Sequence, residues 1–431
     1  MPTKPRDGLA WNDTGLNNVP VWTRDPNLDG IVKTCREKLH TTDVSVSFFA
    51  QGAFNKLYLV QSGENNPSYI MRVSLPVHPQ AKTRGEVTTL RFLRTHTDIP
   101  VPDVLAFDDS ANNEIGFEWI LMECMPGVSL YKKWRTLSAF QKARLVQRVA
   151  GFQSQLMRHP FSGIGTLLDT SEEVGQKPQP GELVSTSFFD GAHFDLDIPR
   201  GPFRSTHDWL ASYLQIAISD HATDKKEAED EEDEDDVADA EFALGVTRQL
   251  ISLLPKIFPP LVNPPERSVI MHQDLSLCNI LVNDRGEITA IVDWECVSAM
   301  PLWMATEMPK FLDLSTRDEE PRRDGYGDES DGENGGDGGD DDDALDNEGK
   351  NELYWIHLME YETTQLRELY NTSMRQMNPG WGLLVDDSAF RQDFARAAFY
   401  CGYGFSLKKI AKWVDAVEQG EYPRLMDVLE G

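Results

Sequence analysis

VIMHQDLSLCNILVNDRGEITAIVDWE, residues 269–295, places histidine, aspartate and asparagine residues inside runs of Ile, Leu and Val. The segments NILVN and ITAIVDW have the composition of two short strands, and the DRG between them is typical of a tight turn. Rigid strands hold functional side chains better than loops do. The stretch therefore predicts a buried hairpin that carries a site.

The spacing of the polar residues indicates which chemistry this site performs. His272, Asp274 and, five residues later, Asn279 have the spacing of a kinase catalytic loop, and Asp293 closes the following strand pair. Phosphoryl transfer requires one carboxylate that orients the attacking hydroxyl, and oxygen ligands for Mg²⁺. Asp274, Asn279 and Asp293 supply such groups. The alternative is that they are turn and cap residues, because Asp and Asn readily satisfy nearby backbone groups.

The composition indicates a soluble protein of a reducing compartment. The chain has 431 residues, enough for two or three domain-sized units. Its five cysteines are scattered, odd in number and lack a C-x-x-C pair, which argues against a disulfide framework or a zinc site. No signal peptide, transit peptide or run of 18 apolar residues is present. We therefore expect a cytoplasmic protein without a membrane partner.

The net charge of −30 is concentrated in two segments. Residues 223–241 contain twelve acids and two lysines, and residues 317–349 contain fifteen acids and three arginines, so the rest of the chain is only mildly acidic. Self-repulsion and a lack of apolar periodicity predict disordered insertions at 223–241 and 315–350. This balance also argues against a nucleic-acid partner.

The rest of the chain predicts an α+β protein with two lobes. After an N-terminal extension (1–40), residues 44–76 read as three strands, 81–96 as a helix and 116–127 as a buried strand, which together form a small antiparallel sheet lobe at 41–126. Residues 127–416 form a mainly helical lobe that contains the catalytic loop at 268–295, and a tail follows at 417–431. The helices of this lobe are expected at 138–157, 206–219, 243–257, 351–376 and 387–416.

The motifs HQDLSLCN and IVDWE resemble those of the aminoglycoside phosphotransferase and choline-kinase-like family, within the protein-kinase-like fold. The phrases HPFSGIGTLL and GPFRS resemble a fungal branch of that family. The resemblance implies that Asp274 is the catalytic base, that Asn279 and Asp293 bind Mg²⁺, and that His272 supports the loop. Ser276 after D-L, DWE instead of D-F-G, and the lack of an A-P-E segment favour a small-molecule kinase over a protein kinase.

The resemblance also assigns nucleotide-binding roles to the sheet lobe. Arg72 stands where a strand cation neutralises the phosphates, and Glu86 stands where a helix carboxylate fixes that cation. Lysine is usual in the drug-phosphorylating members, whereas choline-kinase-like relatives resemble this chain in carrying arginine. A surface ion pair is the alternative interpretation of Arg72 and Glu86.

Two further segments of the sheet lobe correspond to parts of the family's nucleotide site. The turn AQGAFNK places Gly52 and Asn55 where the family covers the phosphates. Glu123 and Met125, in LMECM, stand where the interlobe hinge reads the adenine edge through backbone groups.

Neighbouring residues have more ordinary interpretations. Glu295 is either a structural residue or one that supports the site. Cys278 and Cys296 lack the partners of a catalytic cysteine and are interpreted as packing residues. The aromatic stretch 397–413 is expected to be helix core rather than a cage for a cation.

The primary hypothesis is an ATP- and Mg²⁺-dependent phosphotransferase that acts on a hydroxyl group of a small molecule. An alternative is a catalytically weak kinase-like protein that binds a nucleotide or a partner. A more distant one is an acidic calcium-binding or chaperone-like protein. The sequence leaves the acceptor and the oligomeric state open.

Overall fold

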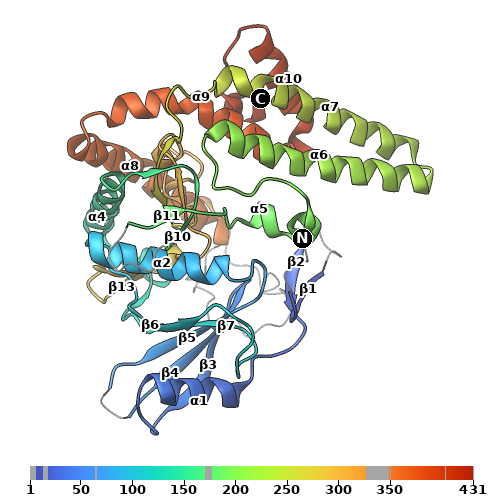
Figure 1. Ribbon diagram of the computed structural model, residues 1–431. Helices are drawn as coiled ribbons and strands as arrows, with labels where there is room; N and C mark the ends of the chain where they lie inside the picture. Colours follow the sequence, from blue (N-terminus) through green and yellow to red (C-terminus); the bar gives the residue numbers. More distant parts are fainter. Residues whose placement is uncertain are drawn as a thin grey trace.

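The computed structural model describes residues 6–12, 18–63, 66–169, 177–326, 349, 351–402 and 404–430. A sheet lobe and a larger helical lobe lie against each other, with helix α2 (Ala81–His96) between them (Figure 1). This arrangement confirms the two-lobed α+β fold predicted from the sequence.

The small lobe is built on a five-stranded antiparallel sheet. In spatial order its strands are β3 (Ser45–Gln51), β4 (Asn55–Gln61), β5 (Tyr69–Ser74), β7 (Glu118–Glu123) and β6 (Val104–Asp108). Helix α1 (Leu28–Lys38), capped by Asn27, buries Ile31 and Cys35 against one face of the sheet. The other face packs, through Ile70 and Ile120, in the core that α2 shares with the helical lobe.

Helix α2 approaches the large lobe closely at Gly85. A Cβ atom at this position would lie 2.3 Å from Cγ2 of Thr166, on strand β10 (Gly165–Leu168). Thr166 is buried, and its hydroxyl group is hydrogen-bonded to Ser298 and to the backbone N–H of Val184, both at 2.9 Å. The missing side chain of Gly85 therefore lets the helix that carries Glu86 pack directly on the other lobe.

The N-terminal segment contributes a second connection between the lobes. Strands β1 (Leu9–Asn12) and β2 (Val19–Trp22) form a hairpin whose Leu9 and Trp11 join an apolar cluster with Phe54 of the small lobe and Phe189 of the large lobe. The rings of Phe54 and Phe189 meet edge to face at 5.4 Å. The described residues of the predicted extension 1–40 thus form helix α1 and contribute to the interlobe core.

The large lobe is mainly helical, with two small antiparallel sheets. Its helices are α3 (Leu130–Lys133), α4 (Ala139–Met157), α5 (Thr186–Phe189), α6 (Thr206–Glu231), α7 (Glu234–Ile257), α8 (Glu352–Met377), α9 (Trp381–Tyr400), α10 (Gly404–Glu418) and α11 (Leu425–Glu430). Short 3-10 turns are η1 (Trp134–Thr136), η2 (Gly191–Asp195), η3 (Leu277–Asn279), η4 (Met304–Thr306), η5 (Lys310–Leu312) and η6 (Arg323–Gly325).

The predicted hairpin at 269–295 lies at the junction of the two small sheets. One sheet has the order β11 (Gln179–Pro180), β10, β15 (Ser298–Pro301), β12 (Arg267–Met271) and β9 (Phe161–Ser162). The other has the order β14 (Ile288–Ile291), β13 (Ile280–Val282) and β8 (Val128–Ser129). The catalytic loop leaves β12 and enters β13, so both of its ends are held by strands.

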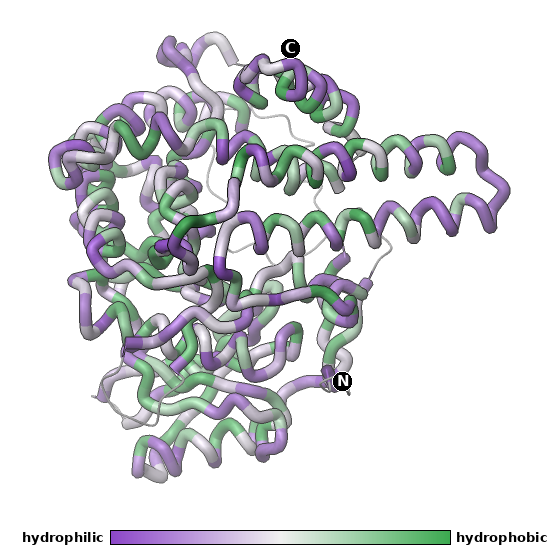
Figure 2. The backbone as a smooth tube through the Cα atoms, turned by 45° about the horizontal axis from the view of Figure 1, so that its top comes forward, coloured by the Kyte–Doolittle hydropathy of each residue, from purple (hydrophilic) through white to green (hydrophobic). Residues whose placement is uncertain are grey.

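The prediction that residues 223–241 are disordered is wrong. Helices α6 and α7 continue through this segment and form a hairpin that projects from the body, with a hydrophilic tip (Figures 1 and 2). Asp233 caps α7, Lys225 pairs with Glu241 at 2.8 Å, and Ala228 and Ala240 are buried between the helices. Glu and Ala are good helix formers, so partner packing outweighs the like-charge repulsion that the composition suggested.

Three other segments also differ from the prediction. Within 315–350, residues 327–348 and 350 lie outside the described residues, but Arg317 is fixed to α8 by an ion pair with Glu360 at 3.1 Å. The predicted tail at 417–431 contains α11, whose Leu425 is fully buried, and Arg424 pairs with the buried Asp393 at 2.6 Å. The helix predicted at 387–416 is divided into α9 and α10.

None of the helices in the described ranges combines the length and the apolar character that crossing a bilayer would require.

Replacing Gly85 should destabilise the protein although alanine favours helices. We expect Gly85→Ala to lower the free energy of unfolding by about 1–3 kcal/mol, because the added methyl group overpacks the contact with Thr166. Gly151→Ala in α4 and Gly245→Ala in α7 are matched controls, since a Cβ at either position meets no atom within 4 Å. They should stabilise by about 0.5–1 kcal/mol.

Urea denaturation of the three variants measures these differences. Adding Thr166→Ser to Gly85→Ala removes Cγ2 and keeps the hydroxyl group, so it should recover part of the loss. If Gly85→Ala is as stable as the two controls, the close packing of α2 on β10 does not constrain this position.

Candidate active site

The catalytic loop is a compact turn closed by the predicted base and the predicted metal ligand. The side-chain amide of Asn279 donates to the backbone carbonyl of Asp274 at 2.8 Å and to its Oδ2 at 3.1 Å. The backbone N–H of Ser276 donates to the same carbonyl at 2.8 Å. These bonds fix the Asp274 carboxylate on the surface of the loop, where 53% of its side chain is exposed and a substrate can reach it.

His272 joins this loop to the strand that precedes Asp293. Its Nε2 lies 3.0 Å from the backbone carbonyl of Val292, and its ring meets the indole of Trp294 edge to face at 4.7 Å. Burial lowers the pKa of His272, so the ring is neutral at neutral pH and donates Nε2–H to that carbonyl. These contacts agree with a role of His272 in supporting the loop.

Asp293 has an unusual backbone conformation at the end of this strand. Its φ angle is +64°, which is uncommon for a residue other than glycine. The backbone N–H of the preceding residue, Val292, donates to the carbonyl of Asn279 at 3.0 Å, so Asn279 and Asp293 lie at neighbouring positions. The turn directs the Asp293 carboxylate toward the small lobe, where its Oδ1 accepts from Arg72 at 3.0 Å.

Arg72 is surrounded by three carboxylates. Its guanidinium nitrogens lie 2.8 Å from Glu295, 3.0 Å from Asp293 and 3.4 Å from Glu86. The Arg72 and Glu86 side chains are 7% and 2% exposed, which excludes the surface ion pair that the sequence left open. Burial alone would lower the pKa of Arg72, but the three carboxylates raise it well above the usual range, so the guanidinium stays charged.

The pKa values of two of the acids around Arg72, Glu86 and Glu295, shift in opposite directions. Burial raises the pKa of Glu86 to about 7, because Arg72 at 3.4 Å only partly compensates for the loss of solvation. Burial would also raise the pKa of Glu295, but Arg72 and Lys82 outweigh it and lower the value to about 2. Glu295 is therefore the acid that is firmly ionised, and Glu86 titrates near neutrality.

Lys82 is a second buried cation of the site, and no sequence motif predicted it. Its side chain, 1% exposed, lies 2.6 Å from Glu295 and 2.9 Å from Oδ1 of Asn55. Lysine is rarely buried without a partner, but the helix position alone does not reveal the burial. Glu295 thus joins Arg72, Lys82 and Asn55, which resolves its role in favour of a residue that supports the site.

The turn predicted to cover the phosphates is fixed from within. The Asn55 amide donates to Glu295 at 2.8 Å, and its Oδ1 accepts from Ser74 at 3.1 Å and from Lys82. Asn55 therefore faces inward and braces the turn, in contrast to the direct phosphate contact predicted for it. Gly52 has open space around its Cα, and its N–H donates to the carbonyl of Asn55 at 3.0 Å.

The predicted hinge is a short connection between β7 and β8. The backbone N–H of Glu123 donates to the carbonyl of Asp103 at 2.9 Å, so this group is already used by the sheet. Within the described part of the chain, the backbone N–H and C=O of Met125 have no main-chain partner. Met125 is therefore the better placed of the two predicted residues to offer backbone groups to a base.

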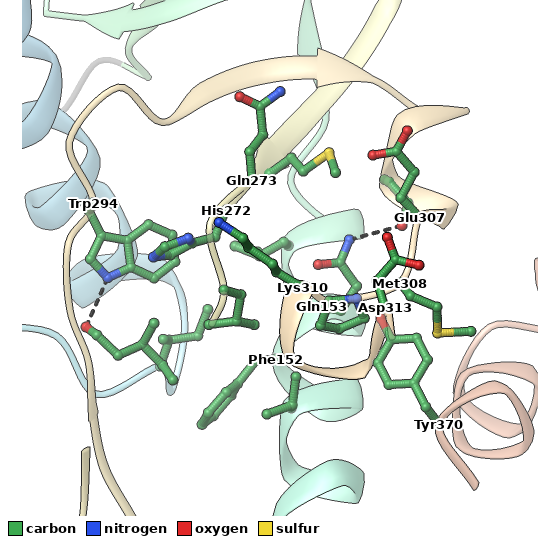
Figure 3. A pocket seen from close by; sticks show the side chains of 18 of the residues that line it. Phe152, Gln153, His272, Gln273, Trp294, Glu307, Met308, Lys310, Asp313 and Tyr370 are labelled. Carbon is green, nitrogen blue, oxygen red and sulfur yellow. Dashed lines mark hydrogen bonds between the residues drawn. The ribbon is translucent and has the colours of Figure 1, made fainter. Parts of the chain in front are cut away.

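A cavity of about 150 Å³ lies behind the catalytic loop (Figure 3). Its inner wall is apolar and includes Phe152, Trp294 and Tyr370, whereas Gln273, Glu307, Lys310, Asp313 and Arg396 supply polar groups. Burial raises the pKa of Glu307 to about 7. Because His272, Gln273 and Leu275 form one side, the cavity adjoins the catalytic loop but does not include Asp274.

Asn279 and Asp293 each provide a side-chain oxygen, the type of ligand that Mg²⁺ prefers. The bonds that Asn279 makes to Asp274 use only its amide nitrogen, and Arg72 contacts only Oδ1 of Asp293. The described residues contain no cluster of three or more His, Cys, Asp or Glu side chains that would hold an ion. Magnesium does not need one, because it keeps several waters and takes few protein ligands.

Comparison with known families identifies the chain. Residues 45–304 match the model of a family described as the phosphotransferase enzyme family. The chain belongs to this family. The match covers both lobes up to η4 and therefore includes all of the predicted site residues, so the resemblance read from HQDLSLCN and IVDWE is confirmed.

The relatives of this phosphotransferase-family chain include fungal proteins, in agreement with the predicted fungal branch. It is 26% identical over 306 residues to a subtelomeric hrmA-associated cluster protein of Aspergillus fumigatus, a match that covers 62% of this chain and 60% of that protein. It is also 26% identical over 237 residues to a clavilactone A biosynthesis cluster protein of Ampulloclitocybe clavipes, covering 54% of each chain. The matched segment thus spans little more than half the length of these relatives.

Solved structures with a similar fold include an ADP-bound aminoglycoside phosphotransferase, APH(2'')-Ib. It is 12% identical, with a TM-score of 0.45, and the alignment covers 92% of this chain and 99% of that chain. An ethanolamine kinase of Plasmodium vivax is also 12% identical, with a TM-score of 0.40, and covers 90% of this chain and 81% of that chain.

The raised pKa of Glu86 predicts a pH-dependent stability difference for Glu86→Gln. The folded-state pKa of about 7 exceeds the ordinary value of 4.5, so wild-type protein loses stability as the pH rises from 4.5 through 7. Glutamine does not titrate. Relative to wild type, Glu86→Gln should therefore gain up to about 3 kcal/mol of unfolding free energy across this interval.

Chemical denaturation at pH 4.5, 6 and 7.5 measures this difference. Glu418→Gln, on the exposed surface of α10, is the control and should follow the wild type at each pH. If the stability difference between Glu86→Gln and the wild type is the same at pH 4.5 and pH 7.5, the pKa of Glu86 is not raised in the folded protein.

Proposed function

We propose that this phosphotransferase-family chain transfers the γ-phosphate of ATP, with Mg²⁺, to a hydroxyl group of a small molecule. The observation that carries the proposal is the meeting of Asp274 and Asn279 on one loop with Asp293, which in turn contacts Arg72 of the other lobe. A base, two metal-ligand oxygens and a phosphate-directed cation are the parts that phosphoryl transfer requires.

Each residue has a distinct task in this proposal. Asp274, exposed on the rigid loop, orients the acceptor hydroxyl and accepts its proton. Asn279 and Asp293 hold the magnesium, which when bound neutralises charge on the phosphate oxygens. Arg72 lies beside Asp293, where Glu86 and Glu295 fix it in place, and offers a forked contact to phosphate.

The arrangement of charges suggests how the site accepts the metal. Arg72 contacts both Asp293, at 3.0 Å, and Glu295, at 2.8 Å, so Glu295 would still hold the guanidinium group if Asp293 bound the metal. Lys82 keeps Glu295 ionised in both cases, because it contacts the same carboxylate oxygen at 2.6 Å. The cation of Arg72 therefore remains in position without depending on Asp293.

Nucleotide binding by three proteins tests the proposal. Calorimetry with ATP, with and without Mg²⁺, should show metal-dependent binding by the wild type. Asp293→Ala should lose that dependence, whereas Asp274→Ala should bind ATP normally and fail to turn it over, with a loss of about 100-fold or more. A phosphate-transfer screen over amino alcohols, sugars and aminoglycosides then searches for the acceptor.

The outcomes separate this proposal from its alternative. A wild type that binds no nucleotide contradicts the proposed function. If the wild type binds Mg·ATP but transfers no phosphate to any acceptor or to water, the chain is a kinase-like binding module instead.

A further inference from the structure

The predicted catalytic base has a basic partner that the sequence motif does not contain. The ammonium group of Lys310 lies 2.7 Å from Oδ1 of Asp274. The two residues are 36 positions apart, and their side chains are 63% and 53% exposed. Of the ion pairs between described residues, this is the one in which Asp274 takes part.

Lys310 is attached rigidly to the catalytic loop through its backbone. It begins the turn η5, whose next residues, Phe311 and Leu312, are 2% and 0% exposed and anchor the turn in the core. The backbone N–H of Phe311 donates to the carbonyl of Leu275, next to Asp274, at 3.1 Å. Figure 3 shows the Lys310 side chain extending toward the end of the loop that carries His272 and Gln273.

Stability does not account for this arrangement. Exposed ion pairs contribute about 0–1 kcal/mol, so a pair this accessible adds little to the fold. A buried anchor that presents an exposed, charged side chain to an exposed carboxylate instead holds a cation where a ligand can reach it.

The other two cations described for the site, Arg72 and Lys82, belong to the small lobe and not to the side that carries Asp274. Arg72 is surrounded by three carboxylates, and Lys82 is buried behind Glu295. During phosphoryl transfer, negative charge spreads over three equatorial oxygens of the moving group, which ends beside the acceptor that Asp274 orients. Positive charge on the Asp274 side of the site stabilises that state most directly.

We propose that Lys310 binds the transferred phosphoryl group and stabilises it on the acceptor side, an inference that rests on the function proposed above. When nucleotide binds, the ammonium group exchanges the Asp274 carboxylate for a γ-phosphate oxygen. This exchange also frees Asp274 to accept a proton.

The transfer step is balanced without a further reactant. The acceptor oxygen forms a bond to the γ-phosphorus and gives its proton to Asp274. The bond between that phosphorus and the β–γ bridging oxygen breaks, and its electron pair leaves with ADP. Lys310 stays protonated throughout and contributes charge alone.

Because this contact is to the γ-phosphate, Lys310→Ala should weaken the binding of a nucleotide that has a γ-phosphate more than the binding of ADP. With Mg²⁺ present, calorimetry should show ADP affinity within about twofold of the wild type and affinity for a non-hydrolysable ATP analogue reduced about tenfold. ATP turnover with water as acceptor should fall by about 100-fold or more. Lys310→Arg keeps the charge and should recover most of the analogue's affinity.

Lys133→Ala is the matched control. Lys133 also forms an exposed ion pair, with Asp284 at 3.2 Å, but it lies outside the site, so both affinities and turnover should be unchanged. Thermal unfolding of each variant checks that the fold is intact.

Two results would overturn the inference while the proposed function stands. In one, Lys310→Ala binds the analogue and turns over ATP like the wild type. In the other, ADP and the analogue weaken equally, which places Lys310 away from the γ-phosphate. If the wild type binds neither nucleotide, the proposed function fails and this inference fails with it.

Discussion

The buried guanidinium of Arg72 is the interaction on which the site depends. It brings Glu86 from helix α2 together with Asp293 and Glu295 from the segment after β14, so one side chain connects the two lobes. A buried cation without partners is very unfavourable, and removing one partner of a buried pair leaves an uncompensated charge. The lobes must therefore meet in a way that keeps these carboxylates around Arg72, and Lys82 supplies the second positive charge that the three acids require.

Packing holds the lobes in the relation that this charge cluster needs. Gly85 lets α2 lie directly on β10, and the contact between Phe54 and Phe189 ties the turn between β3 and β4 to the helical lobe. The N-terminal hairpin adds Leu9 and Trp11 to the same apolar cluster. Non-polar contacts thus provide the stability, because the hydrophobic effect is the dominant favourable term in folding, while the ionic network at the centre fixes geometry.

How much of the site could be predicted depended on whether its residues share a local motif. Asp274, Asn279 and Asp293 lie within one short stretch, where spacing along the chain nearly determines spacing in the structure. Lys310 and Lys82 belong to no motif, and they reach the site because a turn and a helix are packed there by residues distant in sequence. Asn55 was predicted to contact phosphate, and only its bonds to Glu295, Ser74 and Lys82 reveal that its side chain faces inward.

The two-lobed architecture and the positions of helices α2, α4 and α8 could be predicted from the sequence, because apolar periodicity and turn residues are local properties of the chain. The tertiary structure decided what depends on partners. The acidic segment 223–241 is helical because α6 and α7 pack against each other. The segment that contains α11 is attached to the helical lobe by the ion pair between Arg424 and the buried Asp393. Burial raises the pKa of Glu86, whereas contacts with Arg72 and Lys82 lower that of Glu295, so the protonation of both acids depends on their neighbours in the folded structure.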